Sequence, residues 1–187
     1  METTEKQLEE IKKVEASTKE LERSKHFAYK AEYKKYVLDV RCFFDETKFS
    51  LADLQADTTS LHEAGMEIKE FLDRNESNQY LLIIEGQASR NSERLTDKNY
   101  NYSFQRALTL MKFWKDVCQI SFNANCEIQI AGSGDGRYNF GYTGGEGTSL
   151  FHQLDSTLMR ERGDKEKDNQ RFVIHIIPKN IIENAEK

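Results

Sequence analysis

The sequence has 187 residues, of which 37% are hydrophobic and 32% charged, and its net charge is -5. This length suits one domain of ordinary size plus an extension, and 11 Phe and 8 Tyr provide enough aromatic surface to exclude wholesale disorder. The acidic balance argues against a nucleic-acid partner, and no apolar run of about 18 residues predicts a membrane-spanning helix.

Residues 1–30 are dominated by charged and polar side chains and predict a helical tether. Its large apolar residues form one thin stripe at helical spacing: Leu8, Ile11, Val14 and Leu21. Such a stripe is compatible with a tether that packs little or with a short dimerising coiled coil. The first residues are acidic and polar, unlike a secretory signal.

A domain over residues 31–180 follows, with its elements predicted by apolar periodicity. Strands are expected over 36–44, 80–84, 126–130 and 171–177, and amphipathic helices over 51–75 and 99–117. The order β-α-β-α-β-β predicts an α+β sandwich with both helices on one face of a mixed sheet. Residues 132–168 are an insertion rich in Gly and aromatic residues, and residues 181–187 form a tail.

Two motifs flank the loop between the second strand and the second helix. Residues 84–89 read I-E-G-Q-A-S, and residues 99–107 read N-x-x-Y-S-x-x-R-A. Later, residues 132–135 read G-S-G-D, and residues 169–173 read N-Q-R-F-V. In this order the four motifs resemble the carboxy-terminal domain of the OmpA/MotB family, and the resemblance implies an OmpA-like fold for roughly residues 37–178.

The resemblance implies a binding site for the peptidoglycan stem peptide, centred on Arg106. The matching arginine of the family pairs with the diaminopimelate carboxylate, and a guanidinium fork suits that task because it binds carboxylates bidentately. Alternatively, Arg106 forms an ion pair with Asp135 or Glu85. The other residues matching the family site are Ser89, Asn99, Ser103, Asn169 and Arg171.

The strand-end loop departs from the family pattern. Ser89 stands where the family has the aspartate that takes the ligand ammonium, while Gln87 and Ala88 replace a histidine and a threonine. Asp97 could supply the missing charge. For Asn99, the preferred interpretation is a helix N-cap rather than a ligand contact. A second hypothesis is therefore an OmpA-like interaction module that no longer binds peptidoglycan and instead binds a protein or a glycan.

Enzymatic and metal-binding motifs are incomplete. His62-Glu63 begins an H-E-x-x-H pattern, but residue 66 is Met, and the Gly-rich stretch from Gly132 lacks the lysine of a phosphate loop. The three cysteines have no metal-ligand or disulfide spacing, so they are expected to be core thiols. We expect a non-catalytic domain without a cofactor.

The layout of a charged helix before an OmpA-like domain resembles MotB-like stator subunits, including that of the Zorya anti-phage system. This resemblance implies a homodimer, a partner membrane subunit and an upstream transmembrane helix that this chain does not include. It places the domain in the cell envelope, on the periplasmic side of the inner membrane. Three thiols and the absence of a signal sequence favour a reducing, cytoplasmic compartment instead.

Overall fold

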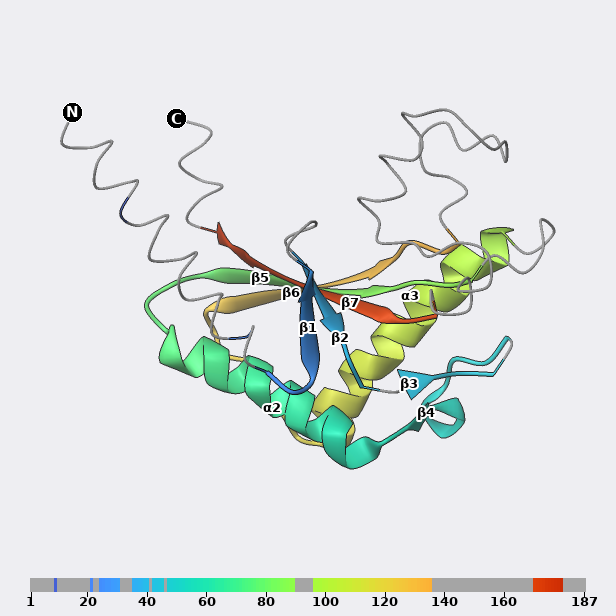
Figure 1. The fold of residues 1–187 in the computed structure, drawn as a ribbon, viewed down its shortest axis with the longest axis horizontal. Helices are drawn as coiled ribbons and strands as arrows, with labels where there is room; N and C mark the ends of the chain where they lie inside the picture. Colours follow the sequence, from blue (N-terminus) through green and yellow to red (C-terminus); the bar gives the residue numbers. More distant parts are fainter. Residues whose placement is uncertain are drawn as a thin grey trace.

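A five-stranded mixed sheet, with two long helices beneath one face, forms the domain in the computed structural model (Figure 1). The structure describes residues 9, 21, 24–30, 35–40, 42–45, 47–89, 96–135 and 170–179. Its strand order is β1-β2-β7-β5-β6. Within the described residues, no helix is long and apolar enough to cross a membrane.

The central strands were predicted in the correct places. β5 (Tyr80–Gly86) pairs in parallel with β6 (Cys126–Gly132) and antiparallel with β7 (Phe172–Pro178). β7 also pairs antiparallel with β2 (Lys35–Leu38), which pairs with β1 (Phe27–Lys30). The α+β class with a mixed sheet is confirmed.

The single strand expected over residues 36–44 is wrong. β2 ends at Leu38, and β3 (Cys42–Phe43) pairs with β4 (Gln55–Ala56) in a separate two-stranded sheet. The alternation that suggested one strand is nevertheless a burial pattern, because its four apolar members are all at most 9% exposed: Leu38, Val40, Cys42 and Phe44. The chain keeps one face on the core while it changes pairing partner.

Both helices begin at residues that differ from those expected from the sequence. Residues 51–53 form a 3-10 turn, η2 (Leu51–Asp53), and α2 (Thr58–Arg74) starts only after Asp57, whose carboxylate accepts hydrogen bonds from the amides of Thr59 and Ser60. α3 (Thr96–Lys112) begins before Asn99 and continues into a π-helical turn, Phe113–Val117. Trp114 is fully buried there, and its indole donates to the Leu61 carbonyl, 2.7 Å away.

The sheet begins within the segment that the sequence assigns to the tether. β1 occupies residues 27–30, and Leu21 and Phe27 are each only 4% exposed in the hydrophobic core. The division into tether, domain and tail stays a prediction, but the residues just before and within β1 pack with the domain.

A pair of glycines allows α3 to lie directly on the sheet. Gly86 and Gly132 face each other across β5 and β6. A Cβ atom on Gly86 would lie 2.1 Å from the backbone oxygen of Ser103, and one on Gly132 would lie 2.5 Å from the backbone nitrogen of Phe104. The helix backbone therefore occupies the space that any larger residue would need.

We predict that Gly86→Ala and Gly132→Ala each lower the free energy of unfolding by about 1–3 kcal/mol, since α3 has to move away from the sheet. Urea denaturation measures this change. Gln129→Ala, at an exposed position of β6, is the control and should change stability by less than about 0.5 kcal/mol. Wild-type stability in both glycine variants would contradict the close approach.

Candidate functional site

Motifs that are distant in sequence meet at one edge of the sheet. β5 and β6 are parallel, so the loops after Gly86 and Gly132 leave from the same edge, and β7 starts there because Phe172 pairs with Gly86. The first turns of α3 lie over this edge. We call the following polar residues of this region the polar edge: Gln87, Ser89, Asn99, Ser103, Arg106, Asp135, Gln170 and Arg171.

One face of α3 contributes three of these side chains. Asn99, Ser103 and Arg106 are spaced by four and three residues, which places them in line on a helix. Their exposed fractions are 5%, 0% and 8%. The structure therefore brings together the three helix residues that the resemblance indicated.

Asn99 does not cap the helix, which corrects that interpretation. It lies inside the first turn of α3, so its amide group is free to point away from the helix end. Its Nδ2 donates to Asp135 Oδ2 at 3.1 Å and lies 3.5 Å from the Ser89 carbonyl oxygen. Asn99 thus joins the loop after β5 to the turn after β6.

Ser103 and Gly134 make a second connection between α3 and that turn. The Ser103 hydroxyl donates to the Tyr100 carbonyl and accepts from the Gly134 amide, both at 2.9 Å. Gly134 has a φ of 55°, and a Cβ there would lie 2.4 Å from the Tyr100 ring. Only glycine fits this turn without strain.

The departures from the family pattern contact the residues at the start of β7. Gln170 Nε2 donates to Ser89 Oγ at 2.8 Å, and Arg171 Nε donates to Gln87 Oε1 at 3.1 Å. The Gln87 amide also donates to the Arg171 carbonyl at 2.9 Å. Ser89 is 7% exposed and Gln87 is 3% exposed. At the position of the family aspartate, the chain therefore holds a neutral hydroxyl that already has a partner.

Arg106 holds the turn between β3 and η2. Its Nε donates to the Lys48 carbonyl and its Nη2 to the Asp45 carbonyl, each at 3.0 Å, and the guanidinium lies 5.4 Å from the centroid of the Phe44 ring. Burial lowers the pKa of Arg106 from its usual value, an effect that Tyr102 partly offsets. The guanidinium remains charged at physiological pH. These hydrogen bonds go to backbone carbonyls, not to Asp135 or Glu85.

Of the two remaining predicted site residues, one is exposed and one lies outside the described residues. The Asp97 side chain is exposed in the first turn of α3, whereas the polar-edge side chains of that helix are buried. Asn169 and the insertion from residue 136 onward lie outside the described residues.

Glu85 and His175 form an ion pair that the sequence analysis missed. Glu85 Oε2 lies 2.6 Å from His175 Nε2, and their side chains are 12% and 14% exposed. Side chains alternate along a strand, so Glu85 faces away from α3, which covers Gly86. Each residue lies within a strand of alternating side chains, so nothing in the sequence indicates their contact. The antiparallel pairing of β5 with β7, which brings them together, is not specified by the sequence.

Burial by itself raises the pKa of Glu85, but hydrogen bonds to His175 and Ser133, together with the His175 charge, outweigh it and leave the pKa below its ordinary value.

Burial raises the pKa of Cys42 to about 12 and that of Cys126 to about 11, so these thiols stay protonated near neutral pH. Within the part of the chain that the structure describes, no cluster of His, Cys, Asp and Glu could hold a metal ion.

We predict that Glu85→Gln lowers the free energy of unfolding by about 1–3 kcal/mol at pH 7, since a hydrogen bond to a buried charge is lost. A carboxylate whose pKa is lower in the folded state stabilises the fold at pH values above its pKa in the unfolded state, which is about 4.3 for Glu. This stabilisation disappears as the pH falls through the folded-state pKa. The difference between wild type and variant should therefore shrink below about pH 4.

Urea denaturation from pH 7 to pH 3 measures this difference. Glu76→Gln, at an exposed position, is the matched control and should leave the stability unchanged within about 0.5 kcal/mol. A difference between wild type and Glu85→Gln that stays constant down to pH 3 would rule out the proposed role of the pair.

No protein-family model matches the sequence, and no curated protein matches it significantly. The chain is similar in structure to the peptidoglycan-associated lipoprotein from Burkholderia pseudomallei, with 13% identity and a TM-score of 0.40 over 73% of this chain and 87% of that one. It is also similar to the OmpA-like domain of FopA1 from Francisella tularensis subsp. tularensis SCHU S4, with 13% identity and a TM-score of 0.41 over 81% and 79% of the two chains.

Proposed function

We propose that this chain is a non-catalytic, OmpA-like binding domain of a cell-envelope protein and that it associates with peptidoglycan. The observation that carries the proposal is the convergence of motifs at the polar edge. The segment after β5, the first turns of α3, the turn after β6 and the start of β7 are joined there by hydrogen bonds between residues 10 to 84 positions apart. These are the segments that resemble the OmpA/MotB family.

In this proposal Arg106 binds a carboxylate of the stem peptide. A guanidinium carries five N–H donors. Nε and Nη2 face the Lys48 and Asp45 carbonyls, so a ligand carboxylate is approached through Nη1. The contacts to the turn orient the guanidinium in advance, which reduces the entropy lost on binding.

The second candidate function is an interaction module that has lost peptidoglycan binding and binds a protein or glycan. One observation favours it: Ser89 accepts a hydrogen bond from Gln170, so the position of the family aspartate offers no charge for a ligand ammonium. Asp97, the proposed substitute, is exposed on α3. In that case Arg106 would bind the carboxylate of a zwitterionic ligand, but no carboxylate of the protein would bind its ammonium group.

The finer assignments belong to the same proposal. Residues 1–30 serve as a tether to an upstream transmembrane helix, with β1 at the end of this tether paired into the sheet, and residues 31–180 form the rest of the domain with its insertion at 132–168. The protein acts as a MotB-like stator-type subunit, as in the Zorya system, on the periplasmic side of the inner membrane. It forms a homodimer through the tether and pairs with a membrane subunit. A monomeric mass in sedimentation equilibrium at high concentration would contradict the homodimer.

Co-sedimentation with purified peptidoglycan sacculi tests the binding. We expect the wild-type chain to pellet with sacculi. Arg106→Ala should reduce the affinity at least about tenfold, because it removes one charge-assisted hydrogen-bonded pair. Arg106→Lys keeps the charge but cannot bridge two carbonyls and a carboxylate, so it should bind weakly as well. Circular dichroism checks that each variant is folded.

A gain-of-function variant separates the two candidates. Ser89→Asp restores the family charge and should strengthen binding about tenfold. Ser77→Asp adds the same charge at an exposed turn and serves as the matched control. Binding by Ser89→Asp alone would show a preserved fold whose site has lost its charge. No binding by wild type or by Ser89→Asp would overturn the peptidoglycan proposal and leave the interaction module.

A further inference from the structure

A pair of aromatic rings lies at the surface close to Arg106. The Phe49 ring, in the turn between β3 and η2, stacks on the Tyr102 ring of α3, with ring centroids 6.0 Å apart and ring planes at 28°. Tyr102 is half-buried and lies one helical turn before Arg106. We call Phe49 and Tyr102 the aromatic pair.

Exposed apolar side chains gather in this turn. Four large apolar side chains are exposed among the described residues, and two of them, Phe49 and Leu51, are only two positions apart. Phe49 is 37% exposed although its ring already contacts Tyr102. Apolar side chains scattered singly over a surface need no explanation, whereas adjoining ones indicate a binding surface.

The backbone that presents Phe49 is anchored on α3. Arg106 donates to the carbonyls of Asp45 and Lys48, each at 3.0 Å, and the Thr109 hydroxyl donates to the carbonyl of Phe49 itself. These bonds hold the turn through its main chain. The exposed part of the Phe49 ring is therefore fixed in place without being covered by a core.

The same turn contains a strained residue. Thr47 has a φ of 64°, in a region that β-branched residues rarely occupy. Such strain persists only where the surroundings hold it, and it is concentrated at binding sites. After Phe49, the Ser50 amide donates to the Asp53 carboxylate at 3.1 Å and fixes the start of η2. The turn thus needs little further ordering when a ligand binds.

A sugar ring is the ligand that suits this surface. One face of a pyranose consists of C–H groups, which pack on the electron-rich face of an aromatic ring. Lys48 and Asp53, on either side of Phe49 in the chain, provide a donor and an acceptor for hydroxyl and N-acetyl groups. A protein partner fits less well, because specific protein interfaces bury about 1,200–2,000 Å² and one aromatic ring only about 150–250 Å².

We propose that the aromatic pair binds an N-acetylated sugar of the peptidoglycan glycan strand while Arg106 binds the stem peptide. This inference rests on the proposed function, which it extends from the peptide to the sugar. The stem peptides are attached to the glycan strand, so a carboxylate held at Arg106 keeps sugars close to the aromatic pair. Two linked contacts on one ligand give a higher affinity than either contact alone.

NMR titration of the full chain with chitotetraose, which consists of N-acetylglucosamine units without a stem peptide, tests the sugar contact. We expect the ring signals of Phe49 and Tyr102 to shift. Phe49→Leu keeps an apolar side chain but removes the ring, and it should weaken chitotetraose binding about tenfold. Phe49→Trp keeps a ring and should bind at least as tightly as the wild type. Unshifted ring signals, or wild-type affinity in Phe49→Leu, would overturn the sugar contact.

Phe104→Leu is the matched control. Phe104 is 39% exposed on the same helix, two positions from Tyr102 and hence on another side of α3, so its variant should bind chitotetraose and sacculi as the wild type does. The anchors of the turn use the carbonyl of Phe49, so Phe49→Leu is expected to fold, and circular dichroism checks this.

Co-sedimentation with sacculi separates this inference from the proposed function. Phe49→Leu should pellet with sacculi more weakly than the wild type and Phe104→Leu. A wild-type chain that pellets with sacculi but does not respond to chitotetraose would overturn the sugar contact and leave the proposed function intact. A chain that responds to chitotetraose through Phe49 but does not pellet with sacculi would overturn the proposed function, while the sugar contact would stand.

Discussion

Two paired glycines decide how closely α3 can lie on the sheet, and the position of α3 in turn sets the contacts that this helix makes at the polar edge. Gly86 and Gly132 admit the helix backbone at Ser103 and Phe104 to distances that a Cβ atom would forbid. At that distance Ser103 reaches the amide of Gly134. A helix displaced by even one side-chain layer could not make this bond, because hydrogen bonds weaken steeply with distance.

The polar edge illustrates the rule that buried polar groups need partners. Three pairs of its side chains hydrogen-bond to one another: Asn99 with Asp135, Ser89 with Gln170, and Gln87 with Arg171. Gln87 and Ser89, which differ from the motif of the family that the sequence resembles, both contact residues at the start of β7. Arg106 differs from these pairs, because its guanidinium donates to the backbone carbonyls of Lys48 and Asp45 and so holds the β3–η2 turn.

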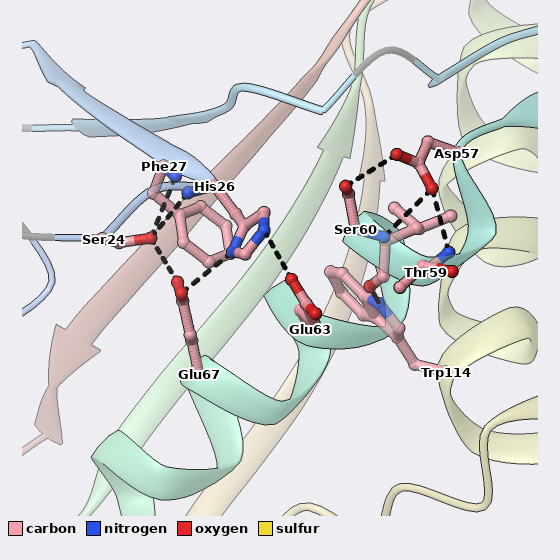
Figure 2. A network of polar contacts seen from close by, with 10 residues as sticks. Ser24, His26, Phe27, Asp57, Thr59, Ser60, Glu63, Glu67 and Trp114 are labelled. Carbon is pink, nitrogen blue, oxygen red and sulfur yellow. Dashed lines mark hydrogen bonds and ion pairs between the residues drawn. The ribbon is translucent and has the colours of Figure 1, made fainter.

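Leu21 and residues 24–26, just before the sheet, pack with the domain, although the composition of residues 1–30 is that of a solvated tether. Leu21 and Phe27 lie in the core, and between them Ser24 and His26 form a polar cluster with Glu63 and Glu67 of α2 (Figure 2). Core packing at both ends keeps the polar cluster in place.

Periodicity alone was enough to predict the α+β class and the strands around Ile84, Ile128 and Ile174, whereas Asn99, Ser103 and Arg106 were indicated by the resemblance to the OmpA/MotB family. The class and the strands follow from local geometry, in which side chains recur every two or 3.6 residues. The break after Leu38, the Glu85–His175 pair and the contacts of Arg106 with the turn at Lys48 could not be predicted in this way. The two side-chain contacts join residues 58 and 90 positions apart, and the break after Leu38 depends on which strands pair with β2 and β3. Such partners meet only once long-range strand pairing has brought the segments together.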